Sequence, residues 1–107
     1  NQFMDKKQKA NNLTQLGVEK MKAELYQEAL KYLDQADVLS PNDAFNLQHR
    51  GATKRVLGDY KGSLEDLNKA DALSPNDACT LRNRGATKKR LGDYKGSLED
   101  LNKADAL

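Results

Sequence analysis

The two residue types most often recruited for catalysis and metal binding occur once each in this chain, as His49 and Cys79. A Cys–His pair acts as nucleophile and base only when a third group orients the imidazole and further donors hold the oxyanion. The sequence shows neither, and one His with one Cys is fewer than the three or four ligands that a zinc site needs. We therefore predict that the chain is not an enzyme and that it holds no metal and no cofactor.

The other candidates for chemistry also favour structural roles. The adjacent carboxylates of Glu65 and Asp66 point apart on a helix, as expected of a solvated face. The glycines are spaced as helix ends and helix contacts are, and they are not grouped as in a phosphate-binding loop. These residues indicate a binding surface rather than a reaction centre.

Composition indicates a thin, elongated molecule rather than one built around a deep core. The chain has 107 residues, of which 32% are charged and 37% are hydrophobic, and its mean hydropathy is −0.89. A single cysteine excludes an intrachain disulfide, and no apolar run has the length needed to span a bilayer. We expect an intracellular, cytoplasmic protein and, because the chain begins with Asn1 rather than Met, a fragment or a processed form.

The chain is built from a repeated unit of 34 residues. Residues 44–73 match residues 78–107 at all but six positions, and a diverged copy occupies residues 10–43. Self-similarity at this period is the signature of helical-repeat architectures. We predict an N-terminal extension at residues 1–9, followed by units at residues 10–43, 44–77 and 78–107, the third of which stops at the end of its second helix.

Each unit is predicted to form two antiparallel helices. In the second unit we expect them near residues 44–57 and 60–73, capped by Asp43 and Asp59. Between them, Gly58 permits a left-handed C-cap. Apolar residues recur at helical spacing and the alternation typical of strands is absent. The expected fold is all-α, a solenoid of three helix-turn-helix units that bury their apolar faces by stacking.

Small residues recur at fixed positions of every unit. They are Gly17, Gly51 and Gly85 in the first helices, Ala29, Ser63, Ser97, Ala36, Ala70 and Ala104 in the second helices, and the closing Pro41 and Pro75. Together with Gly58-Asp59-Tyr60 and Gly92-Asp93-Tyr94, this pattern resembles the tetratricopeptide repeat over residues 10–107. The resemblance implies a right-handed superhelix whose first helices line a concave groove for extended peptides or partner helices.

Four cations stand where that family usually has large apolar or aromatic residues. They are Arg50, Lys54, Arg84 and Lys88. The neighbouring second helices carry Glu65, Asp66, Glu99 and Asp100. We therefore expect these cations to be paired between helices rather than to meet a ligand.

The six differences between the second and third units all lie in first helices. The second, fifth, twelfth and thirteenth positions of the unit share one side of a helix, and by the resemblance that side faces the groove. We predict that groove side chains diversified while packing residues were kept; the alternative is that six substitutions cluster by chance. The predicted groove residues are Thr14, Val18, Phe45, Gln48, His49, Arg55, Val56, Cys79, Arg82, Lys89 and Arg90.

Charge on the first helices indicates the ligand. Those of the second and third units carry basic residues and no acids, so a positive groove is expected, one that attracts an acidic or phosphorylated peptide. Nucleic acid, in particular single-stranded RNA, is the alternative partner. Against it, the groove has few aromatic residues to stack on bases, and Phe45 is the main candidate. One subset of the family clamps the C-terminal carboxylate of chaperone tails with Lys and Asn in the first unit, Asn in the second, and Lys and Arg in the third. None of the matching positions here carries the residue required at that place; they are Thr14, Val18, His49, Cys79 and Asn83.

A third alternative is a structural role. The sequence stops at the end of the second helix of the third unit, which leaves the apolar face of that helix uncovered. We therefore expect either that the native protein continues with more repeats or that copies stack end to end, and we predict association through this end. Light scattering that shows a strict monomer at high concentration would argue against self-association. At the other end, residues 5–9 are expected to extend the first helix or to fray.

Overall fold

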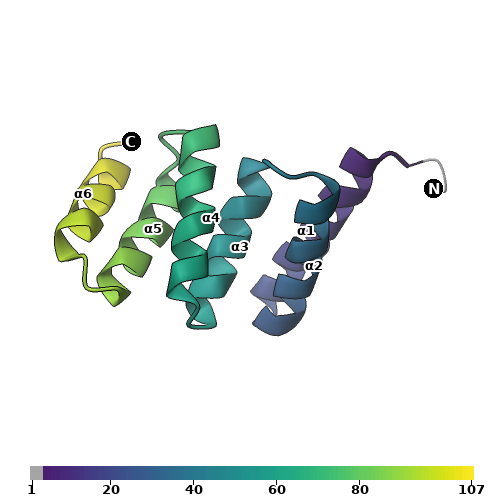
Figure 1. The fold of residues 1–107 in the computed structure, drawn as a ribbon, viewed down its shortest axis with the longest axis horizontal. Helices are drawn as coiled ribbons and strands as arrows, with labels where there is room; N and C mark the ends of the chain where they lie inside the picture. Colours follow the sequence, from purple (N-terminus) through teal and green to yellow (C-terminus); the bar gives the residue numbers. More distant parts are fainter. Residues whose placement is uncertain (1–3) are drawn as a thin grey trace.

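The computed structural model describes residues 4–107 and forms a row of three helical hairpins (Figure 1). The described helices are α1 (Lys6–Lys22), α2 (Tyr26–Leu39), α3 (Ala44–Val56), α4 (Tyr60–Leu73), α5 (Ala78–Arg90) and α6 (Tyr94–Asp105). The molecule measures 48 × 25 × 20 Å along its principal axes. The elongated all-α solenoid predicted from the sequence is confirmed, while the hand of its superhelix stays a prediction.

The first helices of the hairpins form a continuous layer. α1 contacts α3 and α3 contacts α5, whereas the second helices α2, α4 and α6 do not contact one another within residues 4–107. The outer helices of a curved row diverge, so the layer of α1, α3 and α5 is the inner one. Side chains of neighbouring units can meet a common ligand on this layer.

Two glycines set the turns of the second and third hairpins. Gly58 and Gly92 have φ angles of 90° and 87°, in the left-handed region where a side chain is unfavourable. The left-handed turn predicted at Gly58 is confirmed. In the first unit Glu24 takes the same place with a φ of 61°, which costs backbone strain.

Aspartate side chains cap all the helices except α2. In each case the carboxylate accepts a hydrogen bond from the backbone N–H three residues later; the capping residues are Asp5, Asp43, Asp59, Asp77 and Asp93. The carboxylate of Asp5 belongs to a capping box with Gln8, so residues 6–9 extend the first helix rather than fray. Residues 1–3 of the predicted N-terminal extension lie outside the described residues.

The core is a line of leucines and small residues between the helix layers. Its largest members are Leu33, Leu47, Leu67 and Leu81, each no more than 1% exposed. Gly51 permits the close approach of α3 and α4, since a Cβ there would lie 2.7 Å from Leu67 Cγ and 3.3 Å from the carbonyl oxygen of Ser63. The glycine repeated in the first helices is therefore a close-packing position.

A buried carboxylate binds the two cations of α3 that replace apolar residues. Arg50 donates to both oxygens of Asp66 at 2.8 and 2.9 Å, and Lys54 Nζ lies 3.0 Å from the same group. The side chain of Asp66 is only 7% exposed. The pairing between helices predicted for these two cations is confirmed, whereas the solvated position expected for Asp66 is wrong, because the pairing buries its carboxylate.

The third unit repeats this arrangement. Arg84 donates to both oxygens of Asp100 at 2.9 Å, and Lys88 Nζ lies 2.9 Å away. Burial alone would raise the pKa of Asp100, but hydrogen bonds from the two cations outweigh it and hold the pKa below its ordinary value. Asp100 therefore stays charged at neutral pH and keeps both cations from the groove.

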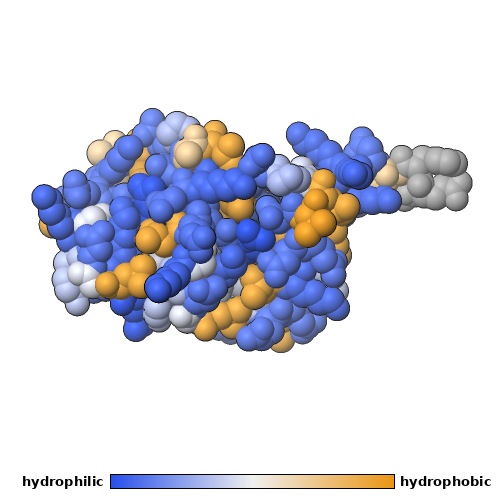
Figure 2. Space-filling view, in the orientation of Figure 1, coloured by the Kyte–Doolittle hydropathy of each residue, from blue (hydrophilic) through white to orange (hydrophobic). Residues whose placement is uncertain are grey.

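Polar residues dominate the surface. On the face shown in Figure 2, hydrophilic side chains cover most of the area and the hydrophobic ones form separate patches. No helix within residues 4–107 combines the length and apolar character needed to cross a bilayer.

Candidate functional site

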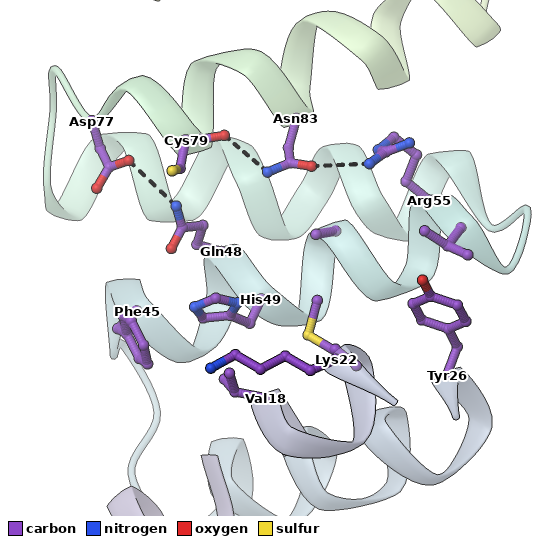
Figure 3. Close-up of a pocket in the computed structure, with 13 residues that line it drawn as sticks. Val18, Lys22, Tyr26, Phe45, Gln48, His49, Arg55, Asp77, Cys79 and Asn83 are labelled. Atoms are coloured by element: carbon purple, nitrogen blue, oxygen red, sulfur yellow. Dashed lines mark hydrogen bonds between the residues drawn. The ribbon is translucent and has the colours of Figure 1, made fainter. Parts of the chain in front are cut away.

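A hollow of about 640 Å³ opens on the inner layer, between the first and third units. Its walls come from the second half of α1, the start of α2, one face of α3 and the first turns of α5 (Figure 3). The lining residues are Val18, Met21, Lys22, Tyr26, Phe45, Gln48, His49, Ala52, Arg55, Val56, Asp77, Cys79 and Asn83. Pockets of roughly 300–1,000 Å³ suit a small ligand or the side chains of a bound peptide.

Two rings one turn apart on α3 form the apolar end of this hollow. The centroids of Phe45 and His49 are 4.4 Å apart with planes at 69°, an edge-to-face contact. Phe45 is 49% exposed, so part of its ring is free to meet a ligand. Figure 3 shows Lys22 and Val18 of α1 facing the same space. This end is suited to an apolar side chain.

Hydrogen bonds tie α3 to the third unit at the polar side of the hollow. Gln48 Nε2 donates to Asp77 Oδ1 at 3.3 Å, and Arg55 Nη2 donates to Asn83 Oδ1 at 3.1 Å. Asn83 in turn donates through Nδ2 to the carbonyl oxygen of Cys79 at 2.9 Å. This chain of bonds holds the Arg55 guanidinium at one end of the hollow, and its Nε is buried with no partner within residues 4–107.

The hollow favours the neutral form of its histidine. Burial lowers the pKa of His49 below its ordinary value, the carboxylate of Asp77 opposes this, and the ammonium of Lys22 lowers the pKa further. The imidazole is therefore uncharged at neutral pH and packs against Phe45 as a weakly polar ring.

Acid is expected to weaken the fold through His49. Its pKa is lower in the folded chain than in the unfolded chain, so its stabilising contribution is complete above about pH 6.5 and is lost as the pH falls. Urea unfolding at about pH 7.5 and about pH 5.5 should show that the free energy of unfolding falls less between these two pH values for His49→Asn than for the parent chain. The third unit carries Asn83 at this position, which makes asparagine a matched replacement. Equal losses in the two proteins would contradict this role of His49.

A second hollow, of about 580 Å³, shares Arg55 with the first. It is lined by Arg55, Ala86, Lys89, Arg90 and Tyr94. The Arg90 guanidinium lies 5.9 Å from the centroid of the Tyr60 ring, at cation–π range. None of the three cations forms an ion pair with a carboxylate of residues 4–107. This second hollow therefore offers unneutralised positive charge.

Most of the predicted groove residues meet in these two hollows. Those lining the first are Val18, Phe45, Gln48, His49, Arg55, Val56 and Cys79. Lys89 and Arg90 line the second. Residues of the first helices that are far apart in sequence thus share one surface.

Thr14 and Arg82 lie outside both hollows. Thr14 is 4% exposed, and its hydroxyl donates to Asn46 Oδ1 at 2.9 Å. Asn46 is itself held by the carbonyl oxygen of Leu33 at 3.0 Å. Thr14 is therefore part of the packing between α1 and α3, which corrects its assignment to the groove. Arg82 is exposed beyond the rims of the two hollows.

The sequence-based prediction left out several lining residues, namely Met21, Lys22, Tyr26, Ala52, Asp77 and Asn83. Lys22 and Tyr26 belong to the diverged first unit, for which the comparison of near-identical copies carries no signal. Asp77 was not among the predicted residues; its carboxylate caps α5 by accepting from the Thr80 N–H and also accepts a hydrogen bond from Gln48. Asn83 could have been predicted as a groove residue, because it stands in the third unit at the position of His49 in the second.

Comparison with known proteins finds the same architecture. Neither a protein-family model nor a curated protein matches the sequence. Among solved structures, the second TPR of Spaghetti (RPAP3) bound to HSP90 peptide SRMEEVD has a TM-score of 0.89 at 19% identity, covering 94% of each chain. The Arabidopsis OM64 TPR domain has a TM-score of 0.88 at 19% identity, covering 92% of this chain and 82% of that one. The TPR2B domain of yeast Sti1 in complex with pHsp70 has a TM-score of 0.83 at 24% identity, with coverages of 90% and 77%.

These similarities show the fold of the chain. The chain has the tetratricopeptide-repeat fold, as its small-residue pattern predicted.

Proposed function

We propose that the chain is a binding scaffold, not an enzyme, and that it captures an extended peptide with an apolar side chain next to an acidic or phosphorylated one. The observation that carries the proposal is that an apolar hollow and a cationic hollow meet at Arg55 on the inner layer. The apolar side chain occupies the first hollow, beside Phe45 and His49. The acidic group occupies the second, among Arg55, Lys89 and Arg90.

The division of the cations supports an anionic ligand. Arg50 and Arg84, together with the lysines one turn later in their helices, are neutralised by buried carboxylates. Arg55, Lys89 and Arg90 lie close to them in sequence but have no carboxylate partner within the described residues. Unpaired cations in a recess attract anions, and guanidinium groups bind carboxylate and phosphate oxygens strongly.

The structural neighbours support a peptide as the partner. The peptide named with the second TPR of Spaghetti, SRMEEVD, combines a methionine with three acidic residues. By analogy this composition suits an apolar hollow beside a cationic one, although the present chain lacks the Lys, Asn and Arg of the carboxylate clamp. The expected ligand is therefore an internal acidic segment rather than a free chain terminus.

Fluorescence polarisation with labelled peptides tests the proposal. The set holds a peptide with one aromatic and two acidic residues, its phosphoserine version, a version with glutamine in place of the acids, and single-stranded RNA of similar length. At near-physiological salt, the acidic peptides should bind at least about tenfold more tightly than the glutamine version. Lys89→Glu/Arg90→Glu should remove this preference.

A second double variant supplies the control. Lys61→Glu/Lys95→Glu makes the same change of charge on the exposed surface of α4 and α6, so it should bind like the parent chain. Equal weakening by both variants would show that net charge rather than the groove governs binding. Tight binding of RNA alone, with a steep dependence on salt, would replace the peptide by nucleic acid as the partner.

A further inference from the structure

The second hollow repeats a part of the first hollow, one unit later in the row. Four of its lining residues have counterparts 34 positions earlier that also line a hollow; the four are Arg55, Ala86, Lys89 and Arg90. Their counterparts in the first hollow are Met21, Ala52, Arg55 and Val56. The same positions of neighbouring units therefore line both hollows, and the two sets of side chains can be compared with each other.

The two sets differ in charge. In the first hollow the cation Arg55 lies with the apolar Met21 and Val56. In the second hollow Arg55 lies with two further cations, Lys89 and Arg90. Because Met21 and Val56 serve at the same positions one unit earlier, the fold does not require cations there. Three like charges in one hollow repel one another, so the second hollow favours a ligand that neutralises them.

Uncharged partners hold the two guanidinium groups of the second hollow. Arg55 Nη2 donates to Asn83 Oδ1 at 3.1 Å (Figure 3). The Arg90 guanidinium lies 5.9 Å from the centroid of the Tyr60 ring, at cation–π range. Arg84, on the same helix as Arg90, is instead neutralised by carboxylates. The amide and the ring thus fix the two guanidinium groups and leave their positive charge available to a ligand.

A phosphate monoester matches these three cations better than a carboxylate does. A phosphorylated side chain carries a charge of about −1.5 to −2 at pH 7 and three strong acceptor oxygens. A carboxylate carries a single negative charge and two oxygens. Two guanidinium groups and one ammonium can each donate to a phosphate, and guanidinium groups suit phosphate geometry particularly well. The second hollow therefore favours a doubly charged anion.

We propose that the second hollow is a binding site for a phosphorylated side chain, phosphoserine or phosphothreonine, of the bound peptide. This rests on the proposed function, which places a peptide on the inner layer, and it narrows the acidic group of that peptide to a phosphate monoester. Arg55, Lys89 and Arg90 bind the phosphate oxygens.

The test uses three fluorescent peptides that differ at one residue only, which is phosphoserine, glutamate or glutamine. The parent chain should bind the phosphoserine version at least about tenfold more tightly than the glutamate version. Arg90→Val installs the residue that the second unit has at this position. Since Arg90 is exposed, the variant should fold like the parent chain. Its preference for phosphoserine over glutamate should fall to about twofold or less.

Two further variants serve as matched controls. Arg82→Gln also replaces an arginine of α5 by the residue of the second unit and removes the same charge, but Arg82 lies outside both hollows. Lys89→Arg keeps the cation and copies Arg55. Both variants should keep the preference of the parent chain for phosphoserine.

The possible failures can be told apart. Equal binding of the phosphoserine and glutamate versions by the parent chain would overturn this inference and leave the peptide scaffold standing. If neither version bound better than the glutamine version, the proposed function would fail as well. An equal loss of preference in Arg82→Gln and Arg90→Val would show that net charge, and not the second hollow, selects the phosphate. Single-stranded RNA that binds more tightly than the phosphopeptide, and is weakened by Arg90→Val, would assign the hollow to phosphodiesters instead.

Discussion

Asp66→Ala is expected to lower the free energy of unfolding by about 3 kcal/mol, which corresponds to a fall in Tm on the order of 15 °C. The carboxylate of Asp66 holds Arg50 and Lys54 through contacts of 2.8 to 3.0 Å. Its removal leaves the Arg50 side chain, only 15% exposed, with the more exposed Asp34 and Asp37 as partners. The cost arises because Arg50 loses its least exposed carboxylate partner and Lys54 loses its carboxylate partner among the described residues. Urea unfolding followed by circular dichroism would measure it.

The first unit provides the control for this prediction. It carries Leu16 and Tyr32 where the second unit has Arg50 and Asp66. The double variant Arg50→Leu/Asp66→Tyr therefore installs a pair that the same fold already accommodates, and it should regain most of the stability lost in Asp66→Ala. Two results would contradict this role of Asp66. One is a double variant that is less stable than Asp66→Ala, and the other is a fall in the free energy of unfolding of less than about 0.5 kcal/mol in Asp66→Ala.

Gly51→Val is expected to cost about 3 kcal/mol, the upper part of the range for overpacking a core. A Cβ at this position would lie 2.7 Å from Leu67 Cγ. Leu67 is completely buried, so its branch point has no space to move into. The helices α3 and α4 would have to separate, and the junctions on both sides would be disturbed. Thermal unfolding by circular dichroism should show a fall in Tm of at least about 10 °C.

Gly85→Val is the matched substitution in the third unit. A Cβ there would meet Leu101 Cγ at 2.9 Å, but Leu101 is only partly buried because, within the described residues, α5 is the one helix that packs on α6. Its side chain can turn outward, so the cost should be about half of that at Gly51. Equal costs at the two glycines would mean that the contact within the hairpin alone, and not the next unit, sets the tightness of packing.

The hairpins could be predicted from the sequence because the chain contains two nearly identical units that can be compared with each other. The match of residues 44–73 to residues 78–107 fixed the period, and Gly58 with its capping Asp59 fixed the turn. The partners of Arg50 and Arg84 were also predictable, since cations at packing positions require nearby acids. Each of these inferences depends on local spacing along one hairpin.

The groove was only partly predictable, because its shape depends on contacts between hairpins. Thr14 lies on the same side of its helix as groove residues, yet its hydroxyl donates to Asn46 of the next unit and is buried between α1 and α3. Lys22 and Tyr26 enter the hollow from the end of α1 and the start of α2, and their places follow from how the first unit packs on the second. Helical periodicity gives the side of a helix and does not give the neighbour that covers it.

The most direct test of the groove as the peptide site is an NMR titration of the isotope-labelled chain with the tightest-binding acidic peptide. The largest shift changes are predicted for backbone amides of α3 and α5 near Phe45, Arg55 and Lys89, with little change on α2 and α4. Changes concentrated on α2 and α4, the outer layer, would contradict the assignment of the binding surface to α1, α3 and α5.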